Sequence, residues 1–378
     1  MFAIAIILLS ASITAHAGGI TLKAGEDRFI QIGYRLQVLT QIGQNQAGAA
    51  AGDPTVSGDH TDLYLRRSRL LVGGQAAPGV NFFLQLADDN RGKSYAASTG
   101  VKTLDGWIEL DSGTAGKVMA GIFPVQFSRS RLTSPFSSIA LDRAAIDELQ
   151  LDSTALDGKR DRGLLLWGNI GGFQYRLAAG KGAKPQETGA ETIRYHGRVH
   201  ISLMDGEEDF LYKESYQGGK DIFTIGYGFD RQDKASTDVA GKPAGYSAWT
   251  ADVAMEGRTE SGVMSLVGAY YSYDWSNPGK KDSSGNYVQG KGWQATLAWM
   301  SMEKQGGIQP YARYVVWDAE SASSGASQRS TALGFNYLLS GFDAKLVFDF
   351  EQISFPTEGA TWDRKNHSVT SMQWQISF

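Results

Sequence analysis

Apolar and polar side chains alternate over many stretches of this chain of 378 residues. In residues 30–38 each even-numbered side chain is apolar, and each odd-numbered position is polar or glycine. Alternation with a period of two predicts β-strands with one apolar and one polar face. The stretches between turn signals predict about 16 strands of roughly 9 to 14 residues. Met204–Lys220 is either a long periplasmic turn or two more short strands, which would make the number about 18. The same alternation is present in residues 223–229, 249–255, 333–337 and 344–350.

Short and long connections alternate between these predicted strands. Short connections at one end of a sheet and long ones at the other are typical of a transmembrane barrel with short periplasmic turns and long extracellular loops. The predicted short turns are residues 76–79, 111–116, 171–172, 258–262, 303–307 and 340–341. The predicted long loops are residues 43–60, 89–102, 125–159, 182–191, 232–245, 276–290, 319–328 and 356–366.

The alternation continues to the last residue of the chain. Met372, Trp374, Ile376 and Phe378 are large and apolar, and the residues between them are polar. Periodicity alone fits a strand of a soluble sandwich as well as a strand of a membrane barrel. The terminal aromatic residue with these apolar positions before it resembles the C-terminal signature of bacterial outer-membrane β-barrels, which the barrel-assembly machinery recognises.

Aromatic residues are frequent near the ends of the predicted strands. In a membrane barrel such residues form belts at the level of the lipid headgroups, whereas ordinary β-propensity is the alternative explanation. The belt hypothesis applies to Trp107, Trp167, Tyr270, Tyr271, Tyr273, Trp275, Trp293, Trp299 and Trp317.

The composition indicates one β-rich unit rather than several domains. Glycine is abundant with 46 residues and proline is scarce with 9, which suits many strands joined by tight turns. No composition shift or linker divides residues 18–378, so they are expected to form a single barrel domain. The absence of cysteine excludes disulfides and thiolate metal sites, and the net charge of −4 argues against a nucleic-acid partner.

The first residues have the pattern of an export signal. An apolar stretch at Phe2–Leu9 precedes Ala15, His16 and Ala17, which form a cleavage site of the A-x-A type. Residues 1–17 are therefore predicted to be a signal peptide, although no Lys or Arg precedes the apolar stretch. No run of 18 consecutive apolar residues occurs in the chain. The expected product is therefore a secreted, periplasmic or barrel protein.

The region from Leu63 to Gly168 carries a series of more specific motifs. Residues 64–73 are Y-L-R-R-S-R-L-L-V-G. Then follow Pro78 and Gly79, residues 82–88, residues 105–108, residues 121–127 and Arg160–Gly163. In this order the motifs resemble the phosphate-selective porin O and P family of outer-membrane channels. The resemblance implies a 16-stranded barrel, often a homotrimer, with basic residues along the lumen and an inward-folded loop that narrows it.

Basic residues on the polar faces of the strands are the candidate selectivity residues. In Ile193–Leu203, Arg194, His196, Arg198 and His200 alternate with apolar residues. A cation facing lipid at mid-depth costs about 2–4 kcal/mol, so these four side chains are expected to face the lumen. The alternative is that they pair with lumenal carboxylates and serve only structure. The carboxylates considered are Asp252, Glu256, Asp349 and Glu351.

Arginines of two N-terminal strands are expected to join this lumenal set. Arg35 lies on the polar face of its strand. Arg67 and Arg69 are assigned to the lumen as well, which leaves Arg66 on the outside with its guanidinium reaching the rim. The two histidines of the 194–200 column lack a third ligand at a suitable spacing, so no metal site is predicted.

The longest predicted loop, Val125–Lys159, is the candidate constriction. It carries Arg129, Arg131 and Arg143 together with apolar residues that can pack against the barrel wall. It also carries acidic residues, and no dense lumenal lysine cluster of the kind implied for phosphate-selective members is apparent in the chain. The acidic residues of this loop are Asp142, Asp147, Glu148, Asp152 and Asp157.

These features predict a passive, water-filled porin of the bacterial outer membrane, in contact with lipid, that favours small anions, with phosphate as one candidate solute. No catalytic motif or cofactor-binding motif occurs, so no enzymatic activity is expected. Two alternatives are a barrel that sheathes or docks a partner such as an electron-conduit cytochrome, and a soluble secreted β-protein.

Overall fold

The structure is a computed structural model that describes most of the chain. The described residues are 19–43, 60–94, 100–152, 156, 159–184, 192–282, 285–301, 307–321, 323, 325–356 and 366–378. The predicted signal peptide and parts of several predicted loops lie outside these residues. Within the described residues, no helix has the length and apolar character needed to span a membrane.

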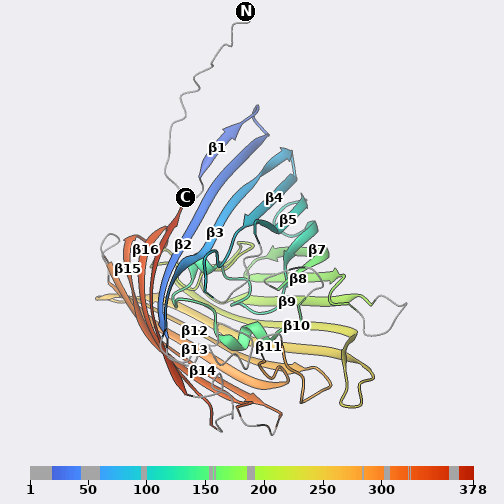
Figure 1. The fold of residues 1–378 in the computed structure, drawn as a ribbon. Coiled ribbons are helices and arrows are strands. Elements are labelled where there is room, and N and C mark those ends of the chain that lie inside the picture. The colour runs from blue at the N-terminus through green and yellow to red at the C-terminus, as the bar shows by residue number, and fades with distance from the viewer. Residues whose placement is uncertain are drawn as a thin grey trace, which may run out of the picture.

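Sixteen antiparallel strands form a closed barrel, and a seventeenth short strand extends one edge of it (Figure 1). Each strand from β2 to β17 pairs with its neighbours in the chain, and β17 pairs with β2 to close the ring. The N-terminal strands are β1 (Ile20–Lys23), β2 (Phe29–Gly43), β3 (His60–Ala77), β4 (Val80–Ala87), β5 (Lys102–Asp111) and β6 (Lys117–Pro124). The next six are β7 (Arg160–Ile170), β8 (Phe173–Gly180), β9 (Arg194–Ser202), β10 (Ile222–Thr237), β11 (Pro243–Arg258) and β12 (Gly262–Asp274). The last five are β13 (Gly290–Ser301), β14 (Gly307–Ala319), β15 (Gln328–Ser340), β16 (Ala344–Ser354) and β17 (His367–Ser377).

The alternation of short and long connections is confirmed. Two-residue turns join β3 to β4 and β7 to β8 at one end of the barrel. This end is called the turn end, and the opposite end is called the loop end. One sequence prediction was wrong in detail. Residues 232–245 are mostly strand, because β10 and β11 pair as far as Thr237 and Pro243 around a bulge after Gln232. Residues 203–221 contain no strand, so the prediction of 16 strands is confirmed and the alternative of 18 is not.

The two faces of the barrel wall differ as the alternation requires. In β9, Tyr195 and Ile201 are about half exposed on the outside, whereas Arg194 and Arg198 are buried on the inside. The same contrast holds around the ring, for example for outward Leu297 on β13 and outward Phe350 on β16. A closed sheet with an apolar outer face leaves no unpaired strand edge, and this is the β architecture that spans a lipid bilayer.

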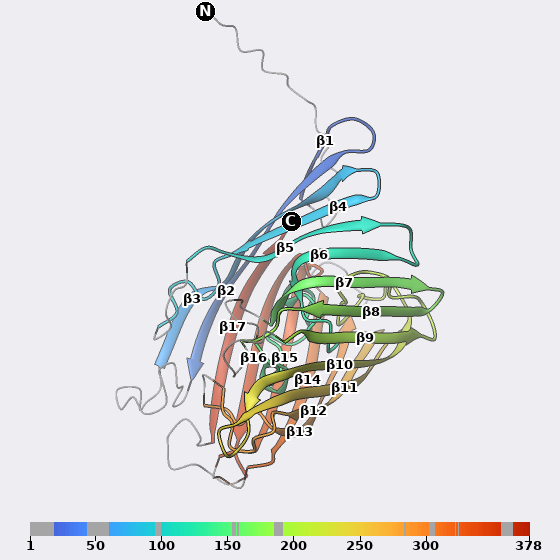
Figure 2. The same ribbon diagram turned by 90° about the vertical axis from the view of Figure 1, so that its right-hand side faces the viewer.

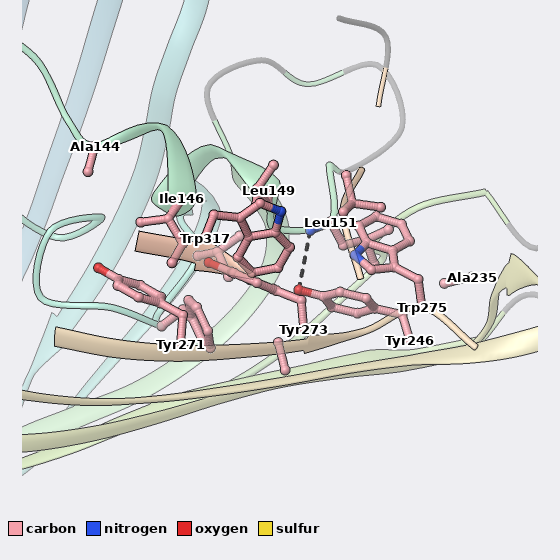
Figure 3. Packing of buried hydrophobic residues seen from close by; sticks show 14 of the residues in the cluster. Ala144, Ile146, Leu149, Leu151, Ala235, Tyr246, Tyr271, Tyr273, Trp275 and Trp317 are labelled. Carbon is pink, nitrogen blue, oxygen red and sulfur yellow. Dashed lines mark hydrogen bonds between the residues drawn. The ribbon is translucent and has the colours of Figure 1, made fainter. Parts of the chain in front are cut away.

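Only part of the predicted aromatic belt faces outward. Tyr270 and Trp293 are 37% and 40% exposed on the outer surface. Tyr271, Tyr273 and Trp317 instead point inward and are buried in an internal apolar cluster (Figure 3). Trp167 is likewise buried inside, so the belt hypothesis was wrong for these residues. Their rings make the inner wall apolar where an internal loop packs against it.

A β-bulge corrects the predicted orientation of Arg66. In the pairing of β2 with β3, Gln37 is opposite Arg67 and Val38 is opposite Leu65, so Arg66 has no partner across the ladder. An extra residue in one strand resets the alternation of faces. Arg66 therefore does not reach the outer rim; its Nε donates to Asp142 of the internal loop at 3.0 Å.

The seam between β17 and β2 ends on the last residue of the chain. Phe378 N–H donates to the carbonyl of Tyr34, and Tyr34 N–H donates to the carbonyl of Phe378, at 3.0 and 2.8 Å. Figure 2 shows β17, in red, running beside β2, in blue. The first residues of β2 extend beyond this seam and pair with β1.

Deletion of Phe378 is expected to reduce the amount of folded protein in the outer membrane far more than it perturbs the lumen. The deletion removes both terminal hydrogen bonds of the seam and the aromatic end of the predicted assembly signal. Heat-modifiable protein in isolated outer membranes measures the first effect, and single-channel conductance of the remaining protein measures the second. Phe335→Leu, on the outer face far from the seam, is the control. An unchanged yield would contradict the expectation.

Candidate functional site in the barrel lumen

Residues 125–159 connect β6 to β7 at the loop end, and residues 125–152 lie inside the barrel. Three inward side chains of the opposite wall donate hydrogen bonds to carbonyl groups of this loop. Gln375 binds the carbonyl of Phe136 at 2.9 Å, and Lys345 binds that of Ser138 at 2.7 Å. Asn336 binds the carbonyl of Ile139 at 2.9 Å. These contacts satisfy buried backbone groups and hold the loop across the full width of the lumen.

An apolar cluster holds the second half of the loop. The short 3-10 helix η3 (Ala145–Leu149) and Leu151 pack on Tyr246, Tyr273 and Trp317 of the wall (Figure 3). The backbone N–H of Leu151 donates to the Tyr246 hydroxyl at 3.3 Å. Removing this apolar surface from water stabilises the loop in its inward position. A second 3-10 helix, η2 (Pro135–Ser137), lies at the far wall.

A second internal segment, residues 203–221, enters the lumen from the turn end. Its backbone binds loop 125–159 at two points: Tyr212 N–H donates to the Leu132 carbonyl at 2.9 Å, and Glu214 N–H donates to the Ser137 carbonyl at 3.1 Å. Sequence analysis missed this role. The signal available in the sequence was the length of this connection between β9 and β10, because all the other described connections at the turn end are short.

A buried ion pair joins the two internal segments. Both guanidinium nitrogens Nη1 and Nη2 of Arg129 donate to the Glu207 carboxylate, at 2.7 and 2.5 Å. The Arg129 guanidinium also lies 5.0 Å from the centre of the Tyr212 ring. Burial opposes ionisation of Glu207, but the charge of Arg129 outweighs it and lowers the pKa of Glu207 to about 2.

The predicted column on β9 faces the lumen, but its arginines are paired. Arg194 binds Asp230 at 2.7 and 2.5 Å, and Arg198 binds Asp252 at 2.5 and 2.7 Å, both through two hydrogen bonds. The alternative of mutual pairing therefore describes these two arginines. Asp230 was not among the carboxylates considered from the sequence.

The two histidines of this column contact the internal segments. His196 Nδ1 accepts a hydrogen bond from the backbone N–H of Gln126 at 2.9 Å. His200 Nδ1 lies 2.9 Å from the hydroxyl of Tyr212 in segment 203–221. No group of three His, Cys, Asp or Glu residues in the described part of the chain could hold a metal ion.

Arg176 on β8 is a functional residue that sequence analysis missed. It is fully buried, and its guanidinium donates to the carbonyls of Phe210 and Asp209 at 2.7 and 3.1 Å. The same guanidinium lies 4.9 Å from the Tyr212 ring centre and 5.1 Å from that of Phe210. Arg176 thus holds segment 203–221 against the wall. Its guanidinium binds the backbone of the segment and contacts the aromatic rings of the segment.

An open cavity of about 330 Å³ remains between the β2–β7 wall and the two internal segments. Among the described residues, five arginines line it but only two carboxylates, those of Asp105 and Asp209. It is called the arginine cavity below. Its arginines are Arg35 and Arg69 on β2 and β3, Arg131 and Arg143 on loop 125–159, and Arg160 on β7.

The arginines of the cavity differ in their partners. Arg69 binds Asp89 at 2.6 Å, and Arg160 binds Asp105 at 3.1 Å. Arg131 lies 3.1 Å from Glu148 and 3.3 Å from Asp147. Among the described residues, Arg35 and Arg143 form no ion pair. Their side chains donate instead to uncharged oxygens of loop 125–159.

The charge of Arg143 is held close to other positive charge. Burial, followed by the positive charge of Arg131, lowers the pKa of Arg143 to about 9. The group therefore stays protonated at pH 7. Burial and the nearby positive charge of Arg131 both disfavour the cationic form of Arg143, and a bound anion would offset both effects. An anion beside Arg143 would therefore be stabilised.

The structure separates the predicted lumenal and loop residues into two groups. Arg35, Arg69, Arg131 and Arg143 line the arginine cavity. The others are not part of its lining; Arg129 connects the two internal segments with each other, and the remaining residues connect the wall with the internal segments. Arg67, for example, binds Asp142 of the loop at 2.6 Å. This second group consists of Arg67, Arg129, Arg194, His196, Arg198 and His200.

The chain resembles known outer-membrane channels in its fold. OmpF of Salmonella typhi, in a complex with daunomycin, aligns with a TM-score of 0.60 at 8% identity, covering 95% of this chain and all of that one. OprB of Pseudomonas putida aligns with 0.56 at 12% identity, covering 92% and 94%. The channel DcaP of Acinetobacter baumannii aligns with 0.55 at 11% identity, covering 94% and 99%. No curated protein sequence matches the chain.

A closed 16-stranded barrel with a lumen lined by polar residues and narrowed by internal segments is the architecture of an outer-membrane porin. The family model for phosphate-selective porin O and P matches residues 40–378. The chain therefore belongs to this family, and it is an outer-membrane channel for the diffusion of solutes.

Glu207→Gln is expected to release segment 203–221 from loop 125–159, because Arg129 would be left buried without its counter-charge. Loss of one partner of a buried pair costs about 3–5 kcal/mol. Faster hydrogen exchange in residues 203–221 and a changed conductance would record the release. The matched control is Glu208→Gln, at an exposed neighbouring carboxylate. Equal exchange in the two variants would contradict the assignment.

The same pair predicts a specific pH dependence. The pKa of Glu207 in the folded protein is about 2, below its ordinary value of 4.5. The stabilisation is therefore complete above the ordinary value and is lost only as the pH falls towards 2. Hydrogen exchange in residues 203–221 is expected to show no change from this pair between about pH 7 and pH 5. A protection step centred near pH 6 would contradict this.

Proposed function

We propose that the channel favours small anions and that they pass through the arginine cavity. The observation that carries the proposal is the excess of guanidinium groups over carboxylates on its wall, with Arg35 and Arg143 outside any ion pair among the described residues. Fixed charge of one sign in a narrow, low-dielectric passage raises the local concentration of ions of the other sign.

The distribution of open space supports this route. On the β9–β11 side, the internal segments cover the ion pairs of Arg194 and Arg198. Arg194 also donates to the Leu151 carbonyl, and Arg198 donates to the Tyr212 hydroxyl. A second cavity of about 140 Å³ at the turn end shares Arg35 and Phe83 with the arginine cavity and reaches Ser377 and Phe378. The two cavities together suggest a path along β2–β4 towards the turn end.

The proposal assigns different roles to the three arginines of the predicted constriction loop. Arg131 and Arg143 face the passage and would select the solute. Arg129 would act as an anchor through Glu207. None of the described residues that line the arginine cavity is a lysine, so its wall does not match the dense lysine cluster implied for phosphate-selective members. Phosphate is therefore proposed only as one of the anions that pass.

The wider biology is proposed on the family resemblance. Residues 1–17 would direct export and be removed, the barrel-assembly machinery would recognise the C-terminal strand, and the product would be a homotrimer. The sheath hypothesis receives less support, because loop 125–159 and segment 203–221 occupy the lumen in which a partner protein would lie.

The double variant Arg35→Gln, Arg143→Gln is expected to lower the ratio of anion to cation permeability by on the order of tenfold, because it removes both unpaired guanidinium groups. The reversal potential of purified channels in a planar bilayer under a chloride salt gradient measures this ratio. Arg231→Gln is the control, since Arg231 is largely exposed to solvent on β10. An unchanged ratio in the double variant would contradict the proposed route.

A further inference from the structure

One side of the arginine cavity is apolar and aromatic. Phe83 of β4 and Trp107 of β5 are neighbours across the strand ladder, and their rings stack with centres 5.4 Å apart. Phe210 of segment 203–221 lies 6.1 Å from Trp107. All three residues line the cavity. Rings facing the lumen of a channel are unexpected, because the inner face of such a barrel is ordinarily polar.

The same cavity also presents Arg35 and Arg143, the two guanidinium groups of its lining that form no ion pair among the described residues. Arg35 donates to the Ser134 hydroxyl at 3.2 Å. Arg143 donates to the carbonyls of Ser130 and Thr133, at 2.9 and 2.6 Å. The two arginines therefore converge on one short stretch of loop 125–159, Arg35 from the wall and Arg143 from within the loop.

Each of these arginines has unused hydrogen-bonding capacity. A guanidinium carries five N–H donors. Among the described residues, the side chain of Arg35 makes one hydrogen bond and that of Arg143 makes two. The remaining donors can bind the two oxygens of a carboxylate, for which the fork of a guanidinium has the right spacing.

The size of the cavity also distinguishes between ligands. At about 330 Å³ it falls within the range of about 300–1,000 Å³ in which pockets bind small organic molecules. Such pockets combine apolar walls with a few placed polar groups. A small inorganic anion would use the guanidinium groups but leave the aromatic wall in water.

From this arrangement we infer that the arginine cavity is a binding site for aromatic carboxylates. The carboxylate lies between Arg35 and Arg143, and the ring of the ligand packs against Phe83, Trp107 and Phe210 in the offset or edge-on geometries that aromatic rings prefer. The inference rests on the proposed function, since it names the class of anion that the passage holds best.

Benzoate, acetate and inorganic phosphate are the probes that test the inference. Each is titrated against the chloride current of the purified wild-type channel in a planar bilayer. Benzoate and acetate share the carboxylate, so the difference between them isolates the ring. Half-maximal reduction of the chloride current is expected at a benzoate concentration at least about tenfold below that of acetate, because the ring is removed from water. Phosphate is expected to reach half-maximal reduction of the chloride current only at a higher concentration than benzoate.

Two variants locate the effect. Phe83→Leu keeps an apolar side chain but removes the ring, and it is expected to bring the ratio of the acetate to the benzoate concentration close to one. Phe335→Leu is the matched control, because Phe335 forms a stacked pair with Phe348 on the outer face of the barrel. It is expected to leave the ratio at the wild-type value. Heat modifiability verifies that both variants are folded.

The outcomes separate the inference from the proposed function. If the wild-type channel prefers anions but binds benzoate no better than acetate, the aromatic carboxylate site is refuted and the anion route stands. If the channel shows no preference for anions, the proposed function fails and the site fails with it. If Phe83→Leu does not fold, the comparison of the three probes on the wild-type channel still decides the question.

Discussion

Every backbone N–H and C=O group that crosses the hydrocarbon of a bilayer must find its partner within the protein. A closed ring of antiparallel strands meets this requirement, and its last step is the pairing of β17 with β2. Closure turns alternate side chains inward, and the 16 strands enclose a wide lumen whose polar side chains need partners of their own. The remaining features of the molecule follow from how those inward groups are satisfied.

Two segments from opposite ends of the barrel supply most of these partners. Loop 125–159 binds inward side chains of β15–β17 through its carbonyl groups and packs on aromatic rings of the wall. Segment 203–221 meets it at the Arg129–Glu207 pair and is held by Arg176. The arginines of β9 are instead paired within the wall, Arg194 with Asp230 of β10 and Arg198 with Asp252 of β11. An arginine that is fully paired supports the wall and adds little net charge to the passage.

Selectivity is consequently assigned to the region where pairing is incomplete. The arginine cavity has more guanidinium groups than carboxylates, and it has aromatic rings on a face that is ordinarily polar. A binding site and a passage have opposite demands, since tight binding slows release. Under the proposed function, a few charges without an ion pair among the described residues, beside an apolar wall, would concentrate one class of solute and still let it leave.

The sequence by itself determined the strands, the turns between them, the apolar face of each strand and the position of the longest connection, because alternation and turn residues are local signals. It did not determine which lumenal arginines are free. Arg66 faces inward because of one bulge, Tyr271 and Trp317 pack inside instead of forming a belt, and residues 203–221 fold into the lumen. Only the tertiary structure decides these points, because ion pairs such as Arg198–Asp252 and Arg129–Glu207 join residues far apart in the chain, and no period in the sequence records them.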